Sequence, residues 1–396
     1  MGSSPIIMLN GFHAVKDGLT THPDDVAGRP VLPFFRALAN NKGILLSTGR
    51  TWKHQRRFSL MTLKTLGLGK RSLEYQIQEE ARHLVDHFRA TKGKPMNPSF
   101  ALTLAVSNVI CVVVFGHRFS TEDETFHQLL EAMEPIFKFG SSTTHFTQIS
   151  KHQATAAPDD LQDFIYSYLA QIEKTKDQPK PAYDESNMIQ SIFDLFLGGT
   201  ETSSTTLYWT LLYMVLYPEV QAKVQKEIDA VVSPGQMICY EDRKNLPYTN
   251  AVIHECQRFS NIIAIGLPRL CVKDTMIRQF SIKRGTVIFP NIASALHDPK
   301  EWETPLQFNP GHFLDKDGNF TCPEAFIPFS LGQRVCWGEK WQRQKMFLFF
   351  SNLLQAFTFH LAEGQRRKHK TYLGGNFAAS HFEICALLAV YRAVMT

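Results

Sequence analysis

The 396-residue sequence lacks the long hydrophobic run that a membrane-spanning helix requires. Its longest apolar stretch, residues 101–115, is interrupted by Thr103, Ser107 and Asn108. That stretch is also shorter than the roughly 20 apolar residues needed to cross a bilayer. No signal peptide is recognisable at the start of the chain, where residues 5–9 have the pattern of a β-strand. We therefore expect residues 101–115 to form a buried helix.

Paired cysteines are absent as well. The seven cysteines are scattered, so no zinc-ribbon or thioredoxin-like spacing occurs. An odd, scattered set is typical of free thiols in a reducing compartment, where most cysteines are small buried hydrophobic residues. The net charge of +5 is modest. It fits either a basic docking face or an ordinary surface, and we expect no nucleic-acid partner.

No internal repeat and no Gly/Ser linker divides the sequence, so we predict a single domain over residues 1–396. Apolar periodicity predicts a mainly α fold with a small β portion, whose longest helix covers residues 188–217 and stops before Pro218. Residues 140–160 lack such periodicity and are predicted to be a loop. The other predicted helices cover residues 12–19, 51–90, 101–116, 219–232, 248–258 and 336–357, with strands and turns at 5–9, 262–292 and 358–396. The 30 phenylalanines predict a core or cavity lined by flat apolar side chains.

The segment FSLGQRVCWG, residues 329–338, carries the most specific chemistry. Gly332 permits a tight turn, and Gly338 permits the close approach of a flat group. Cys336 stands directly before a predicted helix, whose N-terminal N–H groups and dipole favour a thiolate. Arg334 lies two residues earlier and can reach a carboxylate. This combination suits haem iron with an adjacent propionate, whereas a lone cysteine in a turn would more often be a buried structural residue.

The segment resembles the ligand loop FxxGxRxCxG of the cytochrome P-450 superfamily. The resemblance extends from about Pro5 to the C-terminus. Within the superfamily, the chain is similar in particular to the animal microsomal family two. It implies the cytochrome P-450 fold and haem b, with Cys336 as the iron ligand. The implied activity is a monooxygenase that inserts one oxygen atom of O2 into small apolar organic molecules, such as xenobiotics or unsaturated fatty acids. The implied partners are an NADPH-dependent flavoprotein reductase and cytochrome b5, and Lys53, Arg57 and Lys340 are candidate reductase contacts.

Glu255 and Arg258 form an ExxR pattern. Residues three apart share a helix face, so an isolated pair of this kind would usually be a surface salt bridge. The resemblance instead implies a buried core pair on the proximal side of the haem. It also implies that residues 308–313 complete this network, with His312 at the basic position.

Residues 198–202, GGTET, lie within the longest predicted helix. Each glycine weakens a helix by roughly 1 kcal/mol relative to alanine, so the pair suggests local widening or the close approach of another group. An acid beside an alcohol can transfer protons, although both can also simply face solvent. The resemblance implies that Glu201 and Thr202 guide proton delivery.

Trp52 and Arg56 are spaced i, i+4 on a predicted helix, which places an indole N–H donor and a guanidinium on one face. Together they could hold a carboxylate, although each alone would more often be a surface residue. The resemblance assigns both to the haem propionates, together with Arg29, Arg269 and Arg334.

The sequence departs from the family pattern at several points. The N-terminal membrane anchor is expected to be absent, and residues 138–164, where the family has the helices over the substrate cavity, look shortened. Near the haem, Trp337 replaces a smaller residue, Gln342 an alanine and Lys345 a common glutamate. One alternative is therefore a non-catalytic haem-binding truncated isoform without a complete substrate lid. A second is a haem-thiolate isomerase or dehydratase, which the intact proton-delivery pair argues against.

The family implies a location on the cytoplasmic face of the endoplasmic reticulum. Without an anchor, this chain is expected to be soluble or peripheral in the cytoplasm. The basic run 366–370 could contact anionic lipid at about 1 kcal/mol per basic residue, although a solvated loop is the simpler expectation. The sequence specifies neither the substrate nor the position oxidised.

Overall fold

The computed structural model describes residues 5–67, 71–120, 123–124, 126, 163–179, 181–233, 235–363 and 382–388. The chain folds into two compact units. Unit 1 comprises Met1–Gly28, Ile77–Ala105 and Thr202–Thr396, and unit 2 comprises Arg29–Gln76 and Val106–Glu201. Three segments of the sequence lie outside the described residues: the loop predicted at 140–160, the basic run 366–370 and all but the end of the region 138–164. That the chain forms a single domain stays a prediction.

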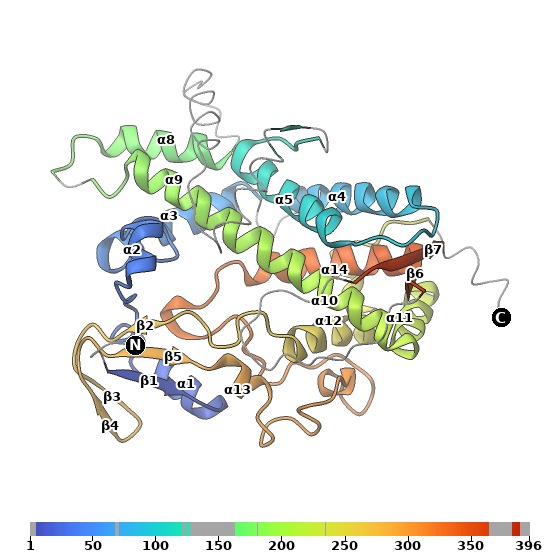
Figure 1. Ribbon diagram of the computed structural model, residues 1–396. Coiled ribbons are helices and arrows are strands. Elements are labelled where there is room, and N and C mark those ends of the chain that lie inside the picture. The colour runs from blue at the N-terminus through green and yellow to red at the C-terminus, as the bar shows by residue number, and fades with distance from the viewer. Residues whose placement is uncertain are drawn as a thin grey trace. The chain divides into compact units, whose positions relative to one another are not determined.

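Helices dominate the described chain (Figure 1). They are α1 (Phe12–Thr20), α2 (Pro33–Ala39), α3 (Gly49–Thr65), α4 (Arg71–Ala90), α5 (Ser99–Phe115), α8 (Phe164–Thr175), α9 (Glu185–Phe196), the π-helix η2 (Leu197–Glu201), α10 (Thr202–Leu216), α11 (Pro218–Val231), α12 (Pro247–Phe259), α13 (Ile292–Leu296) and α14 (Glu339–Ala356), with the 3-10 helices η3 (Tyr240–Lys244), η4 (Pro310–Phe313) and η5 (Gly332–Arg334). The strands are β1 (Ile6–Leu9), β2 (Arg269–Leu270), β3 (Thr275–Ile277), β4 (Phe280–Ile282), β5 (Val287–Pro290), β6 (Phe357–Leu361) and β7 (Ile384–Leu388). The predicted mainly α fold is confirmed.

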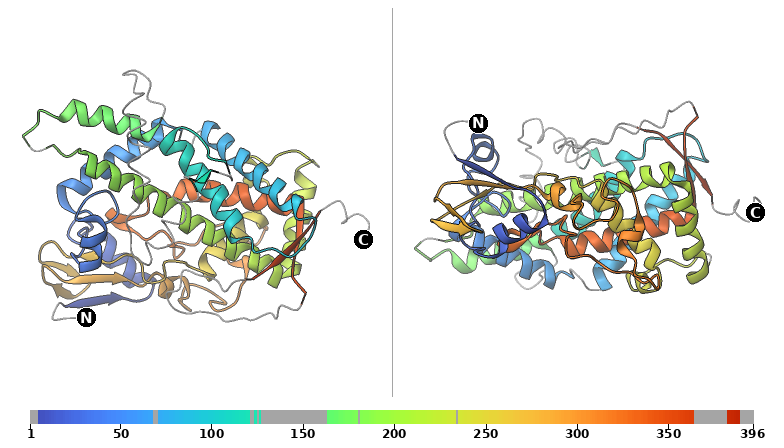
Figure 2. Two further views of the ribbon diagram at one scale, coloured as in Figure 1. Left: turned by 45° about the horizontal axis from the view of Figure 1, so that its top comes forward. Right: turned by 90° about the horizontal axis from the view of Figure 1, so that it is seen from below.

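In unit 1, strands that lie far apart in the sequence form one sheet. β5 lies between β1, which runs parallel to it with Ile6 opposite Val287, and β2, which runs antiparallel. Figure 2 shows the blue β1–α1 segment beside the orange strands. Val15 of α1 and Leu296 of α13 are fully buried in the hydrophobic cluster that this sheet covers. Burial of these apolar side chains holds the N-terminal segment against residues near position 290.

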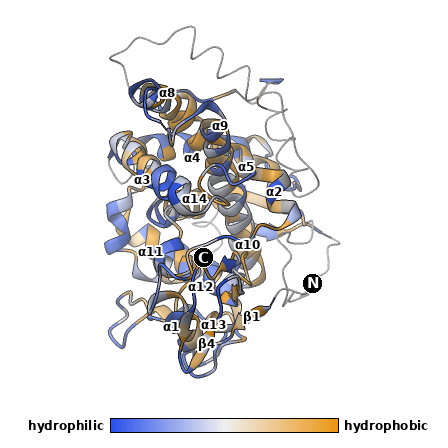
Figure 3. Cartoon of the chain, turned by 90° about the vertical axis from the view of Figure 1, so that its left-hand side faces the viewer, coloured by the Kyte–Doolittle hydropathy of each residue, from blue (hydrophilic) through white to orange (hydrophobic). Residues whose placement is uncertain are grey.

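The helical part of unit 1 is built on α10, α12 and α14, which pack against one another. Most side chains of α14 are buried, including consecutive Phe349 and Phe350, as expected of a helix covered on all sides. The C-terminal part of α4 is amphipathic instead. Its Ile77, Leu84 and Phe88 are buried between exposed polar residues, so the helix carries both colours in Figure 3.

Unit 2 packs α3, α8 and α9 through an aromatic and polar cluster. The Phe58 ring meets the Tyr168 ring edge-on at a centroid distance of 5.0 Å. The buried Tyr168 hydroxyl donates to Gln55 Oε1 at 2.6 Å, and Ser191 Oγ donates to the same oxygen at 3.3 Å. In the part of the chain that the structure covers, no helix is both long and apolar enough to cross a membrane.

Candidate active site

The loop that carries Cys336 leads from η5 into α14. Ser330 and Gly332 both have left-handed backbone angles, with φ of 63° and 74°. A Cβ atom at Gly332 would lie 2.1 Å from the carbonyl oxygen of Leu19, so only glycine fits there. The N–H of Cys336 donates to the carbonyl of Phe329 at 2.9 Å and closes the loop. These constraints hold Cys336 at the N-terminal end of α14.

Cys336 is exposed in the described structure. Among the described residues, a Cβ atom built at Gly338 would meet only Cys336 Sγ, at 3.8 Å. Gly338 is the N-cap residue of α14, so the helix dipole and its N–H groups favour a thiolate at this position. A single exposed, soft sulfur ligand next to a glycine therefore fits a flat haem group.

Two arginines of unit 1 are buried beside the same loop. Arg334 is 6% exposed, and its Nε donates to the carbonyl of Ala27 at 2.8 Å. Arg269 is 4% exposed, and its Nη2 donates to Ser330 Oγ at 3.0 Å and to the Arg334 carbonyl at 3.3 Å. Buried guanidinium groups are costly unless anions offset their charge. Arginine binds carboxylates well, so this pair fits a haem propionate.

Unit 2 contains the other three predicted donors. Trp52 is buried, and the guanidinium carbon of Arg56 lies 5.8 Å from its ring centroid. Arg29 is also buried, and its Nε donates to the carbonyl of Leu45 at 3.0 Å. Burial and the nearby charge of Arg56 lower the pKa of Arg29 to about 10. Both effects disfavour the cation, so a bound carboxylate would be stabilising here.

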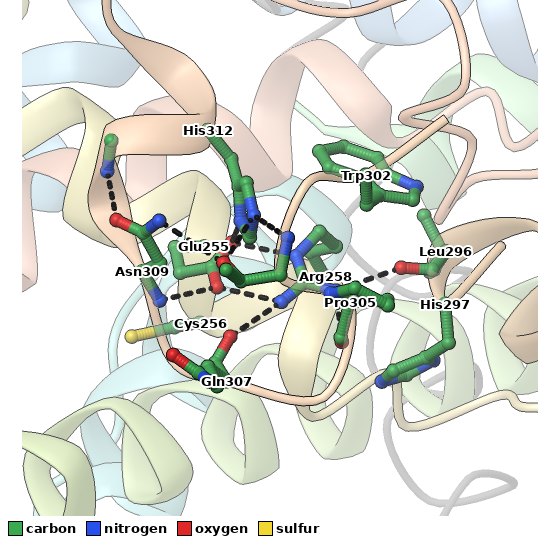
Figure 4. A network of polar contacts seen from close by, with 12 residues as sticks. Glu255, Cys256, Arg258, Leu296, His297, Trp302, Pro305, Gln307, Asn309 and His312 are labelled. Atoms are coloured by element: carbon green, nitrogen blue, oxygen red, sulfur yellow. Dashed lines mark hydrogen bonds and ion pairs between the residues drawn. The ribbon is translucent and has the colours of Figure 1, made fainter. Parts of the chain in front are cut away.

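Glu255 and Arg258 on α12 form a fully buried, two-pronged ion pair. Arg258 Nε donates to Glu255 Oε2 and Arg258 Nη2 to Oε1, both at 2.7 Å. The same guanidinium donates to the carbonyls of Leu296, Pro305 and Gln307 at 2.8–2.9 Å (Figure 4). One side chain thereby ties α12 to the segment that follows α13.

The segment around η4 completes this network from the Glu255 side. The N–H of Asn309 donates to Glu255 Oε1 at 2.8 Å, and His312 Nδ1 lies 3.3 Å from Oε2. The Thr304 N–H donates to His312 Nε2 at 3.2 Å, so that nitrogen is an acceptor and Nδ1 carries the proton. His312 therefore donates to the carboxylate, and Figure 4 shows the contact between the two side chains. Glu255, Arg258, Asn309 and His312 are thus joined in one polar network, and its role on the proximal side of a haem stays a prediction.

The long predicted helix contains a π-helical turn where its two glycines lie. Gly198 is exposed, and no described atom lies within 4 Å of the position of a Cβ atom there. A Cβ atom at Gly199 would lie 2.5 Å from Ile110 Cδ1. The predicted local widening is confirmed as η2, a type of turn that is frequent at functional sites. Glu201 ends this turn and Thr202 begins α10, and both side chains are half-buried.

Asp194 was not among the predicted site residues. It accepts hydrogen bonds from the N–H groups of Ile44 and Leu45, at 2.6 and 2.9 Å, and from Gln190 Nε2 at 3.0 Å. Burial raises its pKa to about 6. An acid within an otherwise apolar stretch of helix was the only sequence signal. Asp194 ties the segment before α3 to α9 within unit 2.

Comparison with known proteins identifies the family. A sequence model of the family described as cytochrome P-450 matches residues 1–148 and 142–379. Human cytochrome P-450 2J2 is 39% identical to this chain, over 98% of the chain and 83% of that protein. Human cytochrome P-450 2C8 is 38% identical, over 93% and 82%, and Rattus norvegicus cytochrome P-450 2B2 is 40% identical, over 91% and 80%. The predicted resemblance is confirmed, and the chain belongs to the cytochrome P-450 family of haem-dependent monooxygenases.

Proposed function

We propose that Cys336 Sγ holds the iron of haem b and that the protein is a haem-thiolate monooxygenase acting on small apolar organic molecules. The observation that carries the proposal is the exposed Cys336 next to Gly338, the N-cap residue of α14. Haem bound in this way supplies oxygen activation, which inserts one atom of O2 into a C–H or C=C bond and releases the other as water. The protein residues hold and orient the reactants.

In this proposal, five side chains bind the haem propionates. Arg269 and Arg334 serve this purpose in unit 1, and Arg29, Trp52 and Arg56 serve it in unit 2. The burial of Arg29, Arg269 and Arg334 supports this role, because a buried guanidinium is stabilised by an anion that binds it. Removing one donor should increase the rate at which haem transfers to an acceptor protein.

Glu201 and Thr202 hold and move protons on the side of the π-helical turn. The π-helical turn supports this role. No described atom lies within 4 Å of a Cβ position at Gly198, and the acid Glu201 and the alcohol Thr202 lie at the end of the same turn. The Thr202→Ala variant should therefore divert reducing equivalents from product to peroxide, by about tenfold or more. Thr202→Ser retains the hydroxyl and should keep the product yield per NADPH close to that of the wild type.

The decisive experiment is the absorption difference spectrum of the reduced, carbon-monoxide-bound protein. The wild type should show the strongly red-shifted band typical of thiolate ligation. Cys336→Ser should lose that band, whereas Cys322→Ser, which changes another exposed cysteine, should keep it. A band at the ordinary haem-protein position in the wild type would refute thiolate ligation.

Electrons come from an NADPH-dependent flavoprotein reductase in this proposal, with cytochrome b5 as a second donor. Lys53 and Arg57 support it, because both are exposed and lie one turn apart on α3, and Lys340 is exposed at the start of α14. Charge reversal at any of these should raise the reductase concentration needed for half-maximal turnover. Lys226→Glu, an exposed change on α11, is the control. Equal values for all four variants would contradict this docking surface.

The proposed substrates and location rest on membership of the cytochrome P-450 family. We place the protein at the cytoplasmic face of the endoplasmic reticulum, and cell fractionation tests this. Unsaturated fatty acids and neutral aromatic xenobiotics should shift the haem absorption band of the purified protein on binding. The alternative of a non-catalytic haem-binding isoform is not favoured, because the family match extends over residues 1–148 and 142–379.

A further inference from the structure

Lys345 on α14 is a buried cation, with only 1% of its surface exposed. Lysine is rarely buried to this extent, because its ammonium group loses its hydration. Burial lowers the pKa of Lys345 to about 7, whereas the negative charge of Cys336 raises it. Burial of Lys345 therefore costs folding stability, which suggests that this lysine has another role.

The direction of the side chain suggests that reason. Lys345 Nζ lies 4.8 Å from the centroid of the Trp341 ring, one helical turn closer to the N-terminus of α14. Helical side chains lean toward the N-terminus of their helix, and this one follows the rule. The N-terminus of α14 is where Gly338 meets Cys336 Sγ. The ammonium group is thus directed toward the ligand-loop end of the helix and is stabilised by the face of an aromatic ring.

We propose that the buried ammonium group of Lys345 offsets part of the negative charge of the Cys336 thiolate and so raises the reduction potential of the bound haem. This inference rests on the proposed ligation by Cys336. The physical basis is electrostatic, since reduction adds one negative charge to the haem centre and a nearby buried cation stabilises the reduced form. Water screens a buried charge poorly, so the effect reaches farther than that of a surface lysine. Lys345 acts as a positioning residue that tunes the ligand, and it contacts no substrate.

The test is a redox titration of the haem-loaded protein at pH 6, below the pKa of Lys345, so that its amino group is protonated, with carbon-monoxide spectra of the same samples. Lys345→Met removes the charge and keeps an apolar chain of similar length. At a fixed potential it should lower the ratio of ferrous to ferric protein about tenfold, a shift of ~59 mV for one electron. Lys345→Glu should lower the ratio further, and Lys345→Gln gives the neutral result again if the Met variant fails to retain haem. Lys226→Met, an exposed lysine on α11, should match the wild type.

The outcomes separate the two proposals. Potentials that fall in the order Lys, Met, Glu support the role of Lys345. A Lys345→Met protein that keeps the red-shifted band and titrates with the wild type overturns this role and leaves Cys336 ligation standing. A wild-type protein without the red-shifted band overturns the ligation and the role of Lys345 together.

Discussion

Replacing Arg258 by methionine should destabilise the protein by about 5 kcal/mol or more. The guanidinium donates five hydrogen bonds, two to Glu255 and three to backbone carbonyls. Removing one partner of a buried ion pair costs about 3–5 kcal/mol, because the other charge stays buried. The Leu296 carbonyl, whose hydrogen bond is buried, adds about 1–3 kcal/mol when left unsatisfied, and the part-buried carbonyls of Pro305 and Gln307 add less. The sum approaches the whole net stability of a typical protein, about 5–15 kcal/mol.

An exposed pair in the same chain provides the matched control. Glu79 and Arg82 on α4 are also an acid and an arginine three residues apart, but the Arg82 side chain is 56% exposed. Arg82→Met should cost at most about 1 kcal/mol, because water screens such pairs. Arg258→Lys keeps the charge, loses the planar fork and should fall between the two.

The assay is urea denaturation of the haem-loaded protein, followed by tryptophan fluorescence and by the haem band. The free energy of unfolding should fall in the order wild type, Arg82→Met, Arg258→Lys and Arg258→Met. Comparable losses of unfolding free energy for Arg258→Met and Arg82→Met would refute the reasoning. They would mean that complete burial does not increase the contribution of the Glu255–Arg258 pair to stability.

Three further predictions concern backbone contacts and one buried acid. Since the folded pKa of Asp194 is raised from 3.8 to about 6, its burial costs stability as pH rises through that interval. Asp194→Asn should remove up to about 3 kcal/mol of this pH dependence, measured by urea midpoints at pH 4 and 7; equal slopes would contradict it. Gly332→Ala should abolish haem incorporation, because its Cβ would clash with a backbone oxygen of α1, and normal haem content would disprove the clash. Gly199→Ala should be about 1–3 kcal/mol less stable than Gly198→Ala in thermal unfolding, because only the former overpacks Ile110; the opposite order would argue against η2 as described.

The features that the sequence predicted best are those where a residue type is conspicuous in its local setting. Two adjacent glycines inside an apolar helix indicated local widening, and the structure has a π-helical turn there. Alternating Gly and Arg before Cys336 indicated a turn that leads into a helix, and η5 and α14 are arranged in that way. Such local signals survive in the fold because the backbone itself requires them.

Features that depend on distant partners could not be predicted. Asp194 is significant because residues 44–45, about 150 positions earlier, present their N–H groups to it. Lysine is usually exposed, and nothing in the local sequence indicates that Lys345 is buried. The seven-residue α2 was missed, because it is too short for a periodic pattern and Pro33 at its start is an ambiguous signal. The misses at Asp194 and Lys345 reflect tertiary packing, whereas α2 was missed because its local signal is weak.

The buried charges of unit 1 fall into two kinds, and the difference connects folding with the cofactor. Glu255 and Arg258 neutralise each other within the chain, so their network is complete as the protein folds. Arg269, Arg334 and Lys345 are all cations, and burying several charges of one sign is unfavourable. The propionates would bring anions to the two arginines, and a Cys336 thiolate bound to iron would place one near Lys345. Haem binding would therefore relieve a cost that folding alone leaves in place, and binding and stability become one coupled equilibrium.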